Sequence, residues 1–367
     1  MRVDSLDTVR GFAILAMIVA HTWVFIRDGT SAATDSALTL VNDVASPLFA
    51  LVIGVTAGLN LTRITRARRG RFVLSWILKA LLLIVIGELL DLRFSGVAIV
   101  LDFLGIAMLA ATPFLFLGSR WLLAAFGALV VLGPLLNLAA REWAHAHPLE
   151  ATTGVGATLL DWTVLGSSYR LTGLLPMILL GLVLSRWQLG DNRRTALVLG
   201  AGIVLVVASL VAESFEQGMG GRVSGSWSDM LRDLGLSLTA YGGITLLLDA
   251  TPDALRRVLR VVARPVTAMG TMALSVYCLH VIVLMVLWTR ILAGEASWLS
   301  IGRQFDPAAG LWVMVVVIAG CALFATLWWR YLGTGPVERV LGVLSLAHDP
   351  DFLWRPRELR RPAGTSP

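Results

Sequence analysis

Long apolar runs separated by short polar segments account for most of the chain. An α-helix needs about 20 apolar residues to cross the hydrocarbon core of a membrane, and each run is close to that length. We therefore predict an all-α polytopic membrane protein with about ten transmembrane helices. The polar break at 118–120 is only three residues long, which leaves a range of nine to eleven helices. The predicted spans are 9–27, 44–62, 72–91, 94–117, 121–139, 170–187, 195–213, 230–249, 265–290 and 309–330.

A few ionisable side chains interrupt these apolar runs. Such a group inside a bilayer costs a few kcal/mol on insertion scales (about 2.5 to 3.5 for a charged residue), so each is a functional hypothesis by default. His21 lies eleven residues after Arg10 on the first predicted helix. At 1.5 Å per residue, that separation is about 16 Å, from one membrane face to mid-membrane or slightly beyond. The other buried ionisable residues are Lys79, Glu88, Asp102 and His280.

His21 admits two interpretations from the pattern alone. A neutral imidazole is the side chain best suited to accept a proton near neutral pH, which indicates catalysis. Alternatively, His21 only forms a hydrogen bond to a neighbouring helix. Asp7 lies three residues before Arg10 on the same helical face, so this pair is also consistent with anchoring the start of the helix.

Asp102 has two candidate partners. It lies at a depth similar to that of His21, and a carboxylate can hold an imidazole in its productive tautomer. It can also pair with Lys79 across the hairpin of the third and fourth helices, because a buried charge requires a partner. The second pairing is favoured, since adjacent antiparallel helices must touch.

The segment between the second and third helices, LTRITRARRGRF, has five arginines in residues 63–71. The tendency of cytoplasmic loops to retain positive charge is sufficient to explain that number. A functional alternative is a phosphate site, because guanidinium groups bind phosphates in a bidentate manner. No Walker or G-x-G-x-x-G pattern accompanies the segment, so neither an ATP-driven pump nor a Rossmann nucleotide site is indicated.

Arginines are distributed unequally between the two ends of the predicted helices. In the ten-helix arrangement, 21 lie at the end that includes both termini and 8 at the opposite end, while Lys79 is within the third helix. The imbalance predicts that both termini are cytoplasmic. We divide the chain into a helical domain, 1–332, and a cytoplasmic tail, 333–367. An apolar stretch in the tail predicts an interfacial helix, followed by a disordered end.

Composition supports the membrane class and narrows the partners. Hydrophobic residues make up 57% of the 367 residues and charged residues 15%, with a mean hydropathy of +0.79. These values lie outside the range of soluble domains. The net charge of +6 is explained by topology, so no nucleic-acid partner is expected. Cys278 and Cys321 lie in apolar segments, and no metal site is predicted.

Three short motifs together resemble the acyltransferase-3 family: Arg10 and His21 in an R-x(10)-H pattern, Arg63 and Arg66 in R-x-x-R, and GTMALSVYCLH at 270–280. LDTVRG, followed by SPLFALVIGVTAG, is similar to heparan-α-glucosaminide N-acetyltransferases. GTGPVERVL at 333–341 is similar to the tail of YeiB-type bacterial membrane proteins. All three groups are classed as transmembrane acyltransferases. One departure is Val276, which stands where the family often has a tyrosine.

The resemblance implies transfer of an acyl group, usually acetyl, from cytoplasmic acyl-CoA to a hydroxyl or amine of a carbohydrate or glycolipid across the membrane. It implies His21 as the catalytic histidine, Arg10, Arg63 and Arg66 on the donor side, and His280 as the late histidine of the site. We expect an integral protein of a bacterial plasma membrane, with membrane lipids as partners. A homo-oligomer is compatible with the sequence.

In this hypothesis His21 deprotonates the acceptor as it attacks the thioester, or first forms an acyl-histidine. Lys79 or a serine would stabilise the oxyanion, and Lys79 is also a candidate for donor binding. The alternative function is a transporter or flippase of a lipid-linked or envelope glycan. The sequence shows no internal repeat of the kind common in transporters, which weighs against it. A non-catalytic scaffold is a third alternative, made less attractive by the intramembrane charges.

Overall fold

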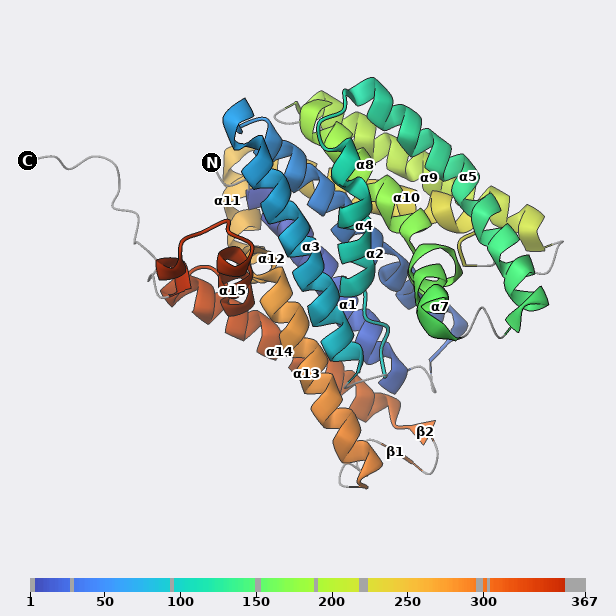
Figure 1. Cartoon of the computed structure of the whole chain (residues 1–367). Helices are drawn as coiled ribbons and strands as arrows, with labels where there is room; N and C mark the ends of the chain where they lie inside the picture. The colour runs from blue at the N-terminus through green and yellow to red at the C-terminus, as the bar shows by residue number, and fades with distance from the viewer. Residues whose placement is uncertain are drawn as a thin grey trace, which may run out of the picture.

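The computed structural model describes residues 4–26, 30–92, 96–148, 153–187, 191–217, 224–294, 300–301 and 304–353, arranged as an assembly of long helices (Figure 1). Parts of the polar segments between the predicted spans, and the predicted disordered end of the tail, lie outside these residues. The helices are α1 (Asp4–Thr22), α2 (Ala32–Leu61), α3 (Arg69–Asp91), α4 (Leu101–Ala111), α5 (Ser119–Ala146), α7 (Gly154–Leu160), α8 (Leu171–Trp187), α9 (Asn192–Gln217), α10 (Trp227–Asp249), α11 (Asp253–Val262), α12 (Arg264–Thr271), α13 (Ala273–Leu292), α14 (Pro307–Tyr331) and α15 (Pro336–Leu344).

Every predicted span contains a helix, and the helical class is confirmed. Seven helices are long and apolar enough to cross a membrane in the described part of the chain, while α4, α7 and α8 belong to shorter apolar segments. The count of ten and the side of the termini therefore stay predictions. Two short antiparallel strands, β1 (Ser300–Ile301) and β2 (Gln304–Phe305), pair with each other between α13 and α14.

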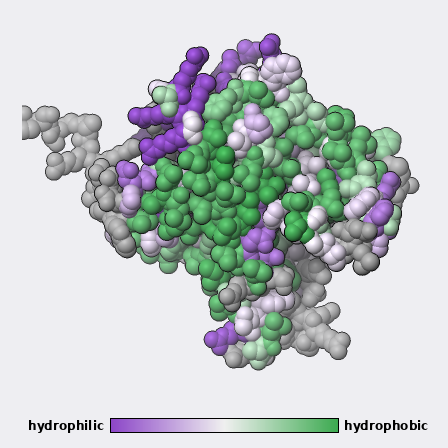
Figure 2. Space-filling model, viewed as in Figure 1, coloured by the Kyte–Doolittle hydropathy of each residue, from purple (hydrophilic) through white to green (hydrophobic). Residues whose placement is uncertain are grey.

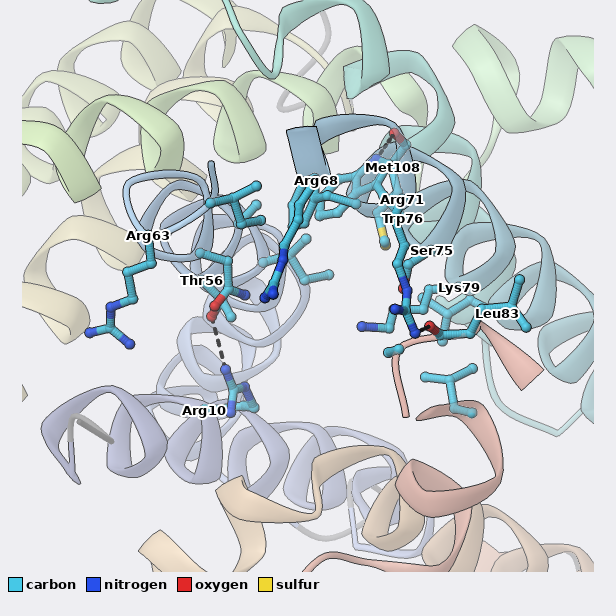
Figure 3. A pocket seen from close by; sticks show the side chains of 18 residues that line it. Arg10, Thr56, Arg63, Arg68, Arg71, Ser75, Trp76, Lys79, Leu83 and Met108 are labelled. Carbon is cyan, nitrogen blue, oxygen red and sulfur yellow. Dashed lines mark hydrogen bonds between the residues drawn. The ribbon is translucent and has the colours of Figure 1, made fainter. Parts of the chain in front are cut away.

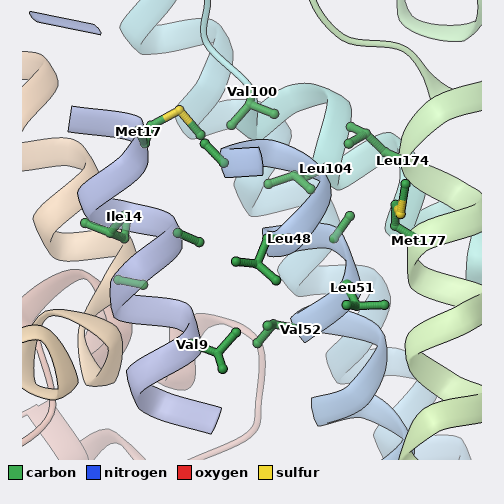
Figure 4. Packing of buried hydrophobic residues seen from close by; sticks show 14 of the residues in the cluster. Val9, Ile14, Met17, Leu48, Leu51, Val52, Val100, Leu104, Leu174 and Met177 are labelled. Carbon is green, nitrogen blue, oxygen red and sulfur yellow. The ribbon is translucent and has the colours of Figure 1, made fainter. Parts of the chain in front are cut away.

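Part of the buried apolar interior lies between α1, α2, α4 and α8 (Figure 4). Ile14 of α1, Leu48 and Leu51 of α2, Leu104 of α4 and Met177 of α8 are almost fully buried there. Within a bilayer, helices gain little from leaving lipid for one another, so close packing must hold them together. This interior keeps α1, the helix with Arg10 and His21, enclosed by protein on several sides.

Glycines allow the closest helix approaches. A Cβ on Gly54 of α2 would collide with the backbone oxygen of Ile178, and one on Gly181 of α8 with that of Leu51. Gly58, one turn beyond Gly54, lies directly against the Ser185 hydroxyl. The small-residue spacing of Gly54 and Gly58 thus serves packing between α2 and α8.

Two predicted spans are interrupted in the structure. The span expected at 94–117 becomes helical only at Leu101, because residues 98–100 run without regular structure into α4. The span expected at 265–290 breaks at Met272, between α12 and α13. Non-helical backbone at membrane depth is tolerated only where protein or a cavity supplies partners. Both breaks lie next to the site described below.

The outer surface agrees with a lipid environment. Figure 2 shows a broad apolar face, with hydrophilic atoms gathered at the end where α2 and α3 meet. Leu74, Leu81, Val85 and Leu89 of α3 are each more than 40% exposed on this surface. A soluble protein rarely exposes such a continuous apolar face, whereas lipid chains would cover it.

The α2–α8 contact can be tested by adding one methyl group. Gly54→Ala should destabilise the protein by about 1–3 kcal/mol, because the helices must move apart to admit the Cβ. Thermal unfolding in detergent measures the effect. Gly127→Ala is the matched control, since nothing lies within 4 Å of its added Cβ. That control should be neutral or slightly stabilising. Equal unfolding temperatures for the two variants would contradict the packing role.

Candidate functional site

The central feature is a buried contact between two histidines from distant parts of the sequence. His21 lies in the last turn of α1 and His280 in the middle of α13, and the two rings stack with centroids 5.2 Å apart. Nδ1 of His21 is 2.9 Å from Nε2 of His280. The side chains are 6% and 0% exposed, respectively. Two polar groups that are costly in lipid are thereby satisfied by each other.

The hydrogen-bond chain fixes which nitrogen carries each proton. Nδ1 of His280 lies 3.2 Å from the Val276 carbonyl, which can only accept a hydrogen bond. A neutral His280 therefore carries its hydrogen on Nδ1 and accepts on Nε2 from Nδ1 of His21. This leaves a lone pair on Nε2 of His21, a buried atom for which no hydrogen-bond partner is found among the described residues, although the Ala98 backbone interacts with His21. Nε2 of His21 is therefore the nitrogen of the pair that is available as a base.

Tyr277 packs against both imidazoles. Its ring lies edge-on to His280, with centroids 5.1 Å apart, and 6.3 Å from the ring of His21. Its hydroxyl accepts a hydrogen bond from the backbone N–H of Val100, at 3.3 Å, where α4 begins. The non-helical approach to α4 and the start of α13 are thus joined at the histidine pair.

A cavity of about 690 Å³ lies at the opposite end of α1 (Figure 3). Its described lining includes five cationic side chains and no acidic one: Arg10, Arg63, Arg68, Arg71 and Lys79. Arg10 is held by Asp7 at 2.9 Å and by the Thr56 hydroxyl at 3.0 Å. Figure 3 shows Arg68 extending toward Arg10. The cavity is suited to an anion with several charges.

An apolar cavity of about 590 Å³ adjoins the arginine-lined cavity. Both are lined by Arg10, Ile53, Lys79, Leu83 and Leu341. The apolar cavity continues past Ile14 and Leu104 to Val100 and Tyr277, so it ends beside the histidine pair. A long ligand would fit the two cavities together, with a charged head in the arginine-lined cavity and a slender uncharged arm in the apolar one.

A third cavity, of about 360 Å³, lies on the other side of the histidine pair. His21 lines it, together with polar side chains that include Asn42, Asp43, Ser168 and Tyr169. Asp43 forms an ion pair with Arg232 at 2.9 Å, which fixes one carboxylate in the wall. His21, which carries the available nitrogen, therefore lies between the polar cavity and the inner end of the apolar cavity.

The sequence profile of the acyltransferase-3 family, described as an acyltransferase domain, matches residues 3–330. The chain belongs to this family. The resemblance expected from the short motifs is confirmed, and the match includes both histidines and the whole lining of the polar cavity. The other two cavities are also lined by residues after 330, which lie outside the match. With its apolar helices, the chain is an integral membrane acyltransferase. No match was found among curated proteins.

The structure brings together only part of the predicted site. His21 and His280 are in contact, and Arg10, Arg63 and Lys79 share one cavity. Arg66 lies in the 3₁₀ turn Arg66–Arg68, is exposed and does not line that cavity. Arg68 and Arg71 line it instead.

Asp102 has a different partner from both that were expected. Its Oδ2 accepts a hydrogen bond from Nε1 of Trp162 at 3.0 Å. It lines a fourth cavity, of about 560 Å³, together with Glu88. This cavity shares Ser168 and Tyr169 with the polar cavity, but neither His21 nor Lys79 lines it in the described part of the chain. The segment that carries Trp162 approaches Asp102 and supplies the hydrogen-bond donor. Considering only the contacts between adjacent helices does not predict this donor.

Two residues of this region were not predicted from the sequence: Tyr277, which lies at its centre, and Glu338, whose carboxylate is held by hydrogen bonds. Glu338 Oε1 accepts from the backbone N–H groups of Leu274, at 2.7 Å, and Ser275, at 3.1 Å. Its other oxygen accepts from the Ser275 hydroxyl. Burial raises the pKa of Glu338, and the hydrogen bonds from Ser275 and Leu274 oppose that shift. The G-P-x-E pattern was the available signal, and the structure shows that its carboxylate caps α13.

The cap gives a testable contribution to stability. Glu338→Ala should lower stability by about 1 kcal/mol, because two backbone N–H groups at the start of α13 lose their acceptor. Thermal unfolding in detergent measures it. Asp253→Ala removes an 80% exposed carboxylate from the first turn of α11 and should change stability by less than about 0.5 kcal/mol. Equal unfolding temperatures for Glu338→Ala and Asp253→Ala would show that the cap does not contribute to stability.

Proposed function

We propose that this acyltransferase moves an acyl group, in the first instance acetyl, from cytoplasmic acyl-CoA to a hydroxyl or amine of a carbohydrate at the other membrane face. The observation that carries the proposal is the buried, unpartnered Nε2 of His21. This nitrogen lies at one end of α1, and the cavity lined by arginines lies at the other. An envelope glycan of a bacterial plasma membrane is the acceptor that we propose.

The shape and charge of the two adjoining cavities support acyl-CoA as the donor. Coenzyme A has three phosphates on its nucleotide end, and Arg63, Arg68 and Arg71 offer guanidinium groups to them. The apolar cavity then accommodates the pantetheine arm, which carries no charge. An arm following its wall past Ile14 reaches Tyr277 with the thioester foremost.

The histidine pair supports proton transfer at that point. Nε2 of His21 accepts the acceptor's proton as its oxygen or nitrogen forms a bond to the thioester carbon. Collapse of the tetrahedral intermediate breaks the carbon–sulfur bond, and the imidazolium returns the proton to the leaving thiolate. His280 positions His21, and its Nε2 stabilises the developing imidazolium by accepting the hydrogen bond from Nδ1–H of His21. A route through an acyl-histidine uses the same nitrogen as nucleophile.

The polar cavity supports a hydroxylated acceptor. Asn42, Asp43, Ser168 and Tyr169 supply both donors and acceptors of hydrogen bonds on one side of His21. A sugar hydroxyl needs such a mixed lining, whereas an acyl chain does not. Entry from this side places the acceptor opposite the donor, so the acyl group alone crosses between the cavities.

Donor binding can be tested with paired arginine variants. Arg68→Ala/Arg71→Ala should weaken coenzyme A binding by about 10²-fold or more, since two charge-assisted contacts are worth about 1.5–3 kcal/mol each. Isothermal titration of the detergent-solubilised protein measures the affinity. Arg66→Ala is the matched control from the same segment and should bind normally. A wild-type protein that does not bind coenzyme A would contradict the donor and favour a glycan transporter.

The role of His21 can be tested by transfer of labelled acetyl. His21→Ala should lower kcat by about 10²–10⁴-fold with coenzyme A affinity retained, because only proton transfer is lost. The assay uses acetyl-CoA and methyl glycosides of glucose and glucosamine, which separate hydroxyl from amine acceptors. His145→Ala, an exposed histidine on α5, serves as the control. Transfer at the wild-type rate by His21→Ala would overturn the mechanism.

A further inference from the structure

Tyr277 lies where the two proposed substrates would meet. It is 2% exposed, it lines the inner end of the apolar cavity, and its ring contacts both imidazoles. Lys79, the residue first considered as a stabiliser of the oxyanion, lines the arginine cavity and its junction with the apolar one. The lysine is therefore placed along the donor path, and the tyrosine at its end.

The hydrogen bond from Val100 leaves the phenolic proton of Tyr277 available. The Val100 N–H donates to the Tyr277 oxygen at 3.3 Å, so that oxygen is already an acceptor. Among the described residues no acceptor for the phenolic hydrogen is found. Val100 immediately precedes α4, whose N-terminus has partial positive charge. Accepting a hydrogen bond polarises the phenol and makes it a stronger donor.

The backbone leading into α4 separates the two substrate cavities. Ala98 lines the polar cavity and Val100 the apolar one, although they are only two residues apart. His21 lies on the polar side with its unpartnered Nε2, and Tyr277 on the apolar side. An acyl carbon between them would have a base on the acceptor side and a phenol on the donor side.

We propose that Tyr277 is a catalytic residue that donates its phenolic hydrogen bond to the thioester carbonyl oxygen and stabilises the oxyanion. This inference rests on the proposed acyl transfer. As the acceptor oxygen bonds to the carbonyl carbon, the π electrons of the carbonyl move to its oxygen, which Tyr277 holds. His21 meanwhile takes the acceptor's proton. When the carbonyl re-forms, the carbon–sulfur bond breaks and the thiolate takes the proton from His21. The Tyr277 proton is never transferred.

Replacement of the phenol tests the proposal directly. Tyr277→Phe should reduce kcat on the order of 10²-fold, the usual effect of losing one oxyanion donor. KM values and coenzyme A affinity should stay at wild-type values, because the bond strengthens only in the transition state. The substrates are acetyl-CoA and the two methyl glycosides. Tyr241→Phe removes a hydroxyl that is equally buried, on α10 and away from the three cavities, and should leave kcat unchanged.

Fluorotyrosine at position 277 separates hydrogen-bond donation from a structural role. Fluorination keeps the hydroxyl and makes it a better donor but a poorer acceptor from Val100. A kcat restored to within a few fold of wild type, after its loss in Tyr277→Phe, would support the proposal. Fluorotyrosine that behaves like phenylalanine, or Tyr277→Phe with wild-type kcat, would overturn it. Wild-type transfer that depends on His21 but not on Tyr277 would overturn this inference alone, whereas no transfer by wild type would overturn the proposed function as well.

Discussion

The hydrogen bond between His21 and His280 is the interaction on which the site depends. Inside a bilayer no water is available to solvate an imidazole, so each histidine needs a protein partner. The bond also ties the end of the first long helix to the middle of α13, 259 residues later in the chain. Close glycine contacts between α1 and α12, the helix that leads directly into α13, hold this part of the chain near α1. An added Cβ on Gly11 or Gly270 would strike the backbone of the other helix.

The length of α1 sets the separation between two kinds of chemistry. Arg10 lies at the cationic cavity and His21 at the polar one, about 16 Å apart along a straight helix. That distance is comparable with an extended pantetheine arm. In the mechanism that we propose, this helix spaces the charged end of the donor from its reactive end, and the closely packed neighbours of α1 keep the spacing constant.

The sequence predicts the helical class and individual polar residues, because hydrophobic periodicity and the cost of buried charge are local properties. The side chains that these polar residues contact are not predicted in the same way, because they come from distant parts of the chain. Asp102 binds Trp162, which is 60 residues away and was not expected to fold against α4. Arg68 rather than Arg66 lines the cavity because side-chain directions in a 3₁₀ turn change by about 120° per residue. The start of α4 depends on a tyrosine hydroxyl from α13, a contact that no pattern within α4 can indicate.

The Glu338 cap has a consequence for how the enzyme is made. Its carboxylate comes from α15, yet it holds the first turn of α13, two residues before Tyr277. Leu341 of the same helix lines both the arginine-lined cavity and the apolar cavity. During synthesis, all seven candidate membrane-spanning helices of the described chain precede this segment. The carboxylate that caps α13 therefore comes from a segment that leaves the ribosome after all seven of these helices. A chain cut before α15 would have these helices but would lack this cap and part of the wall of both cavities.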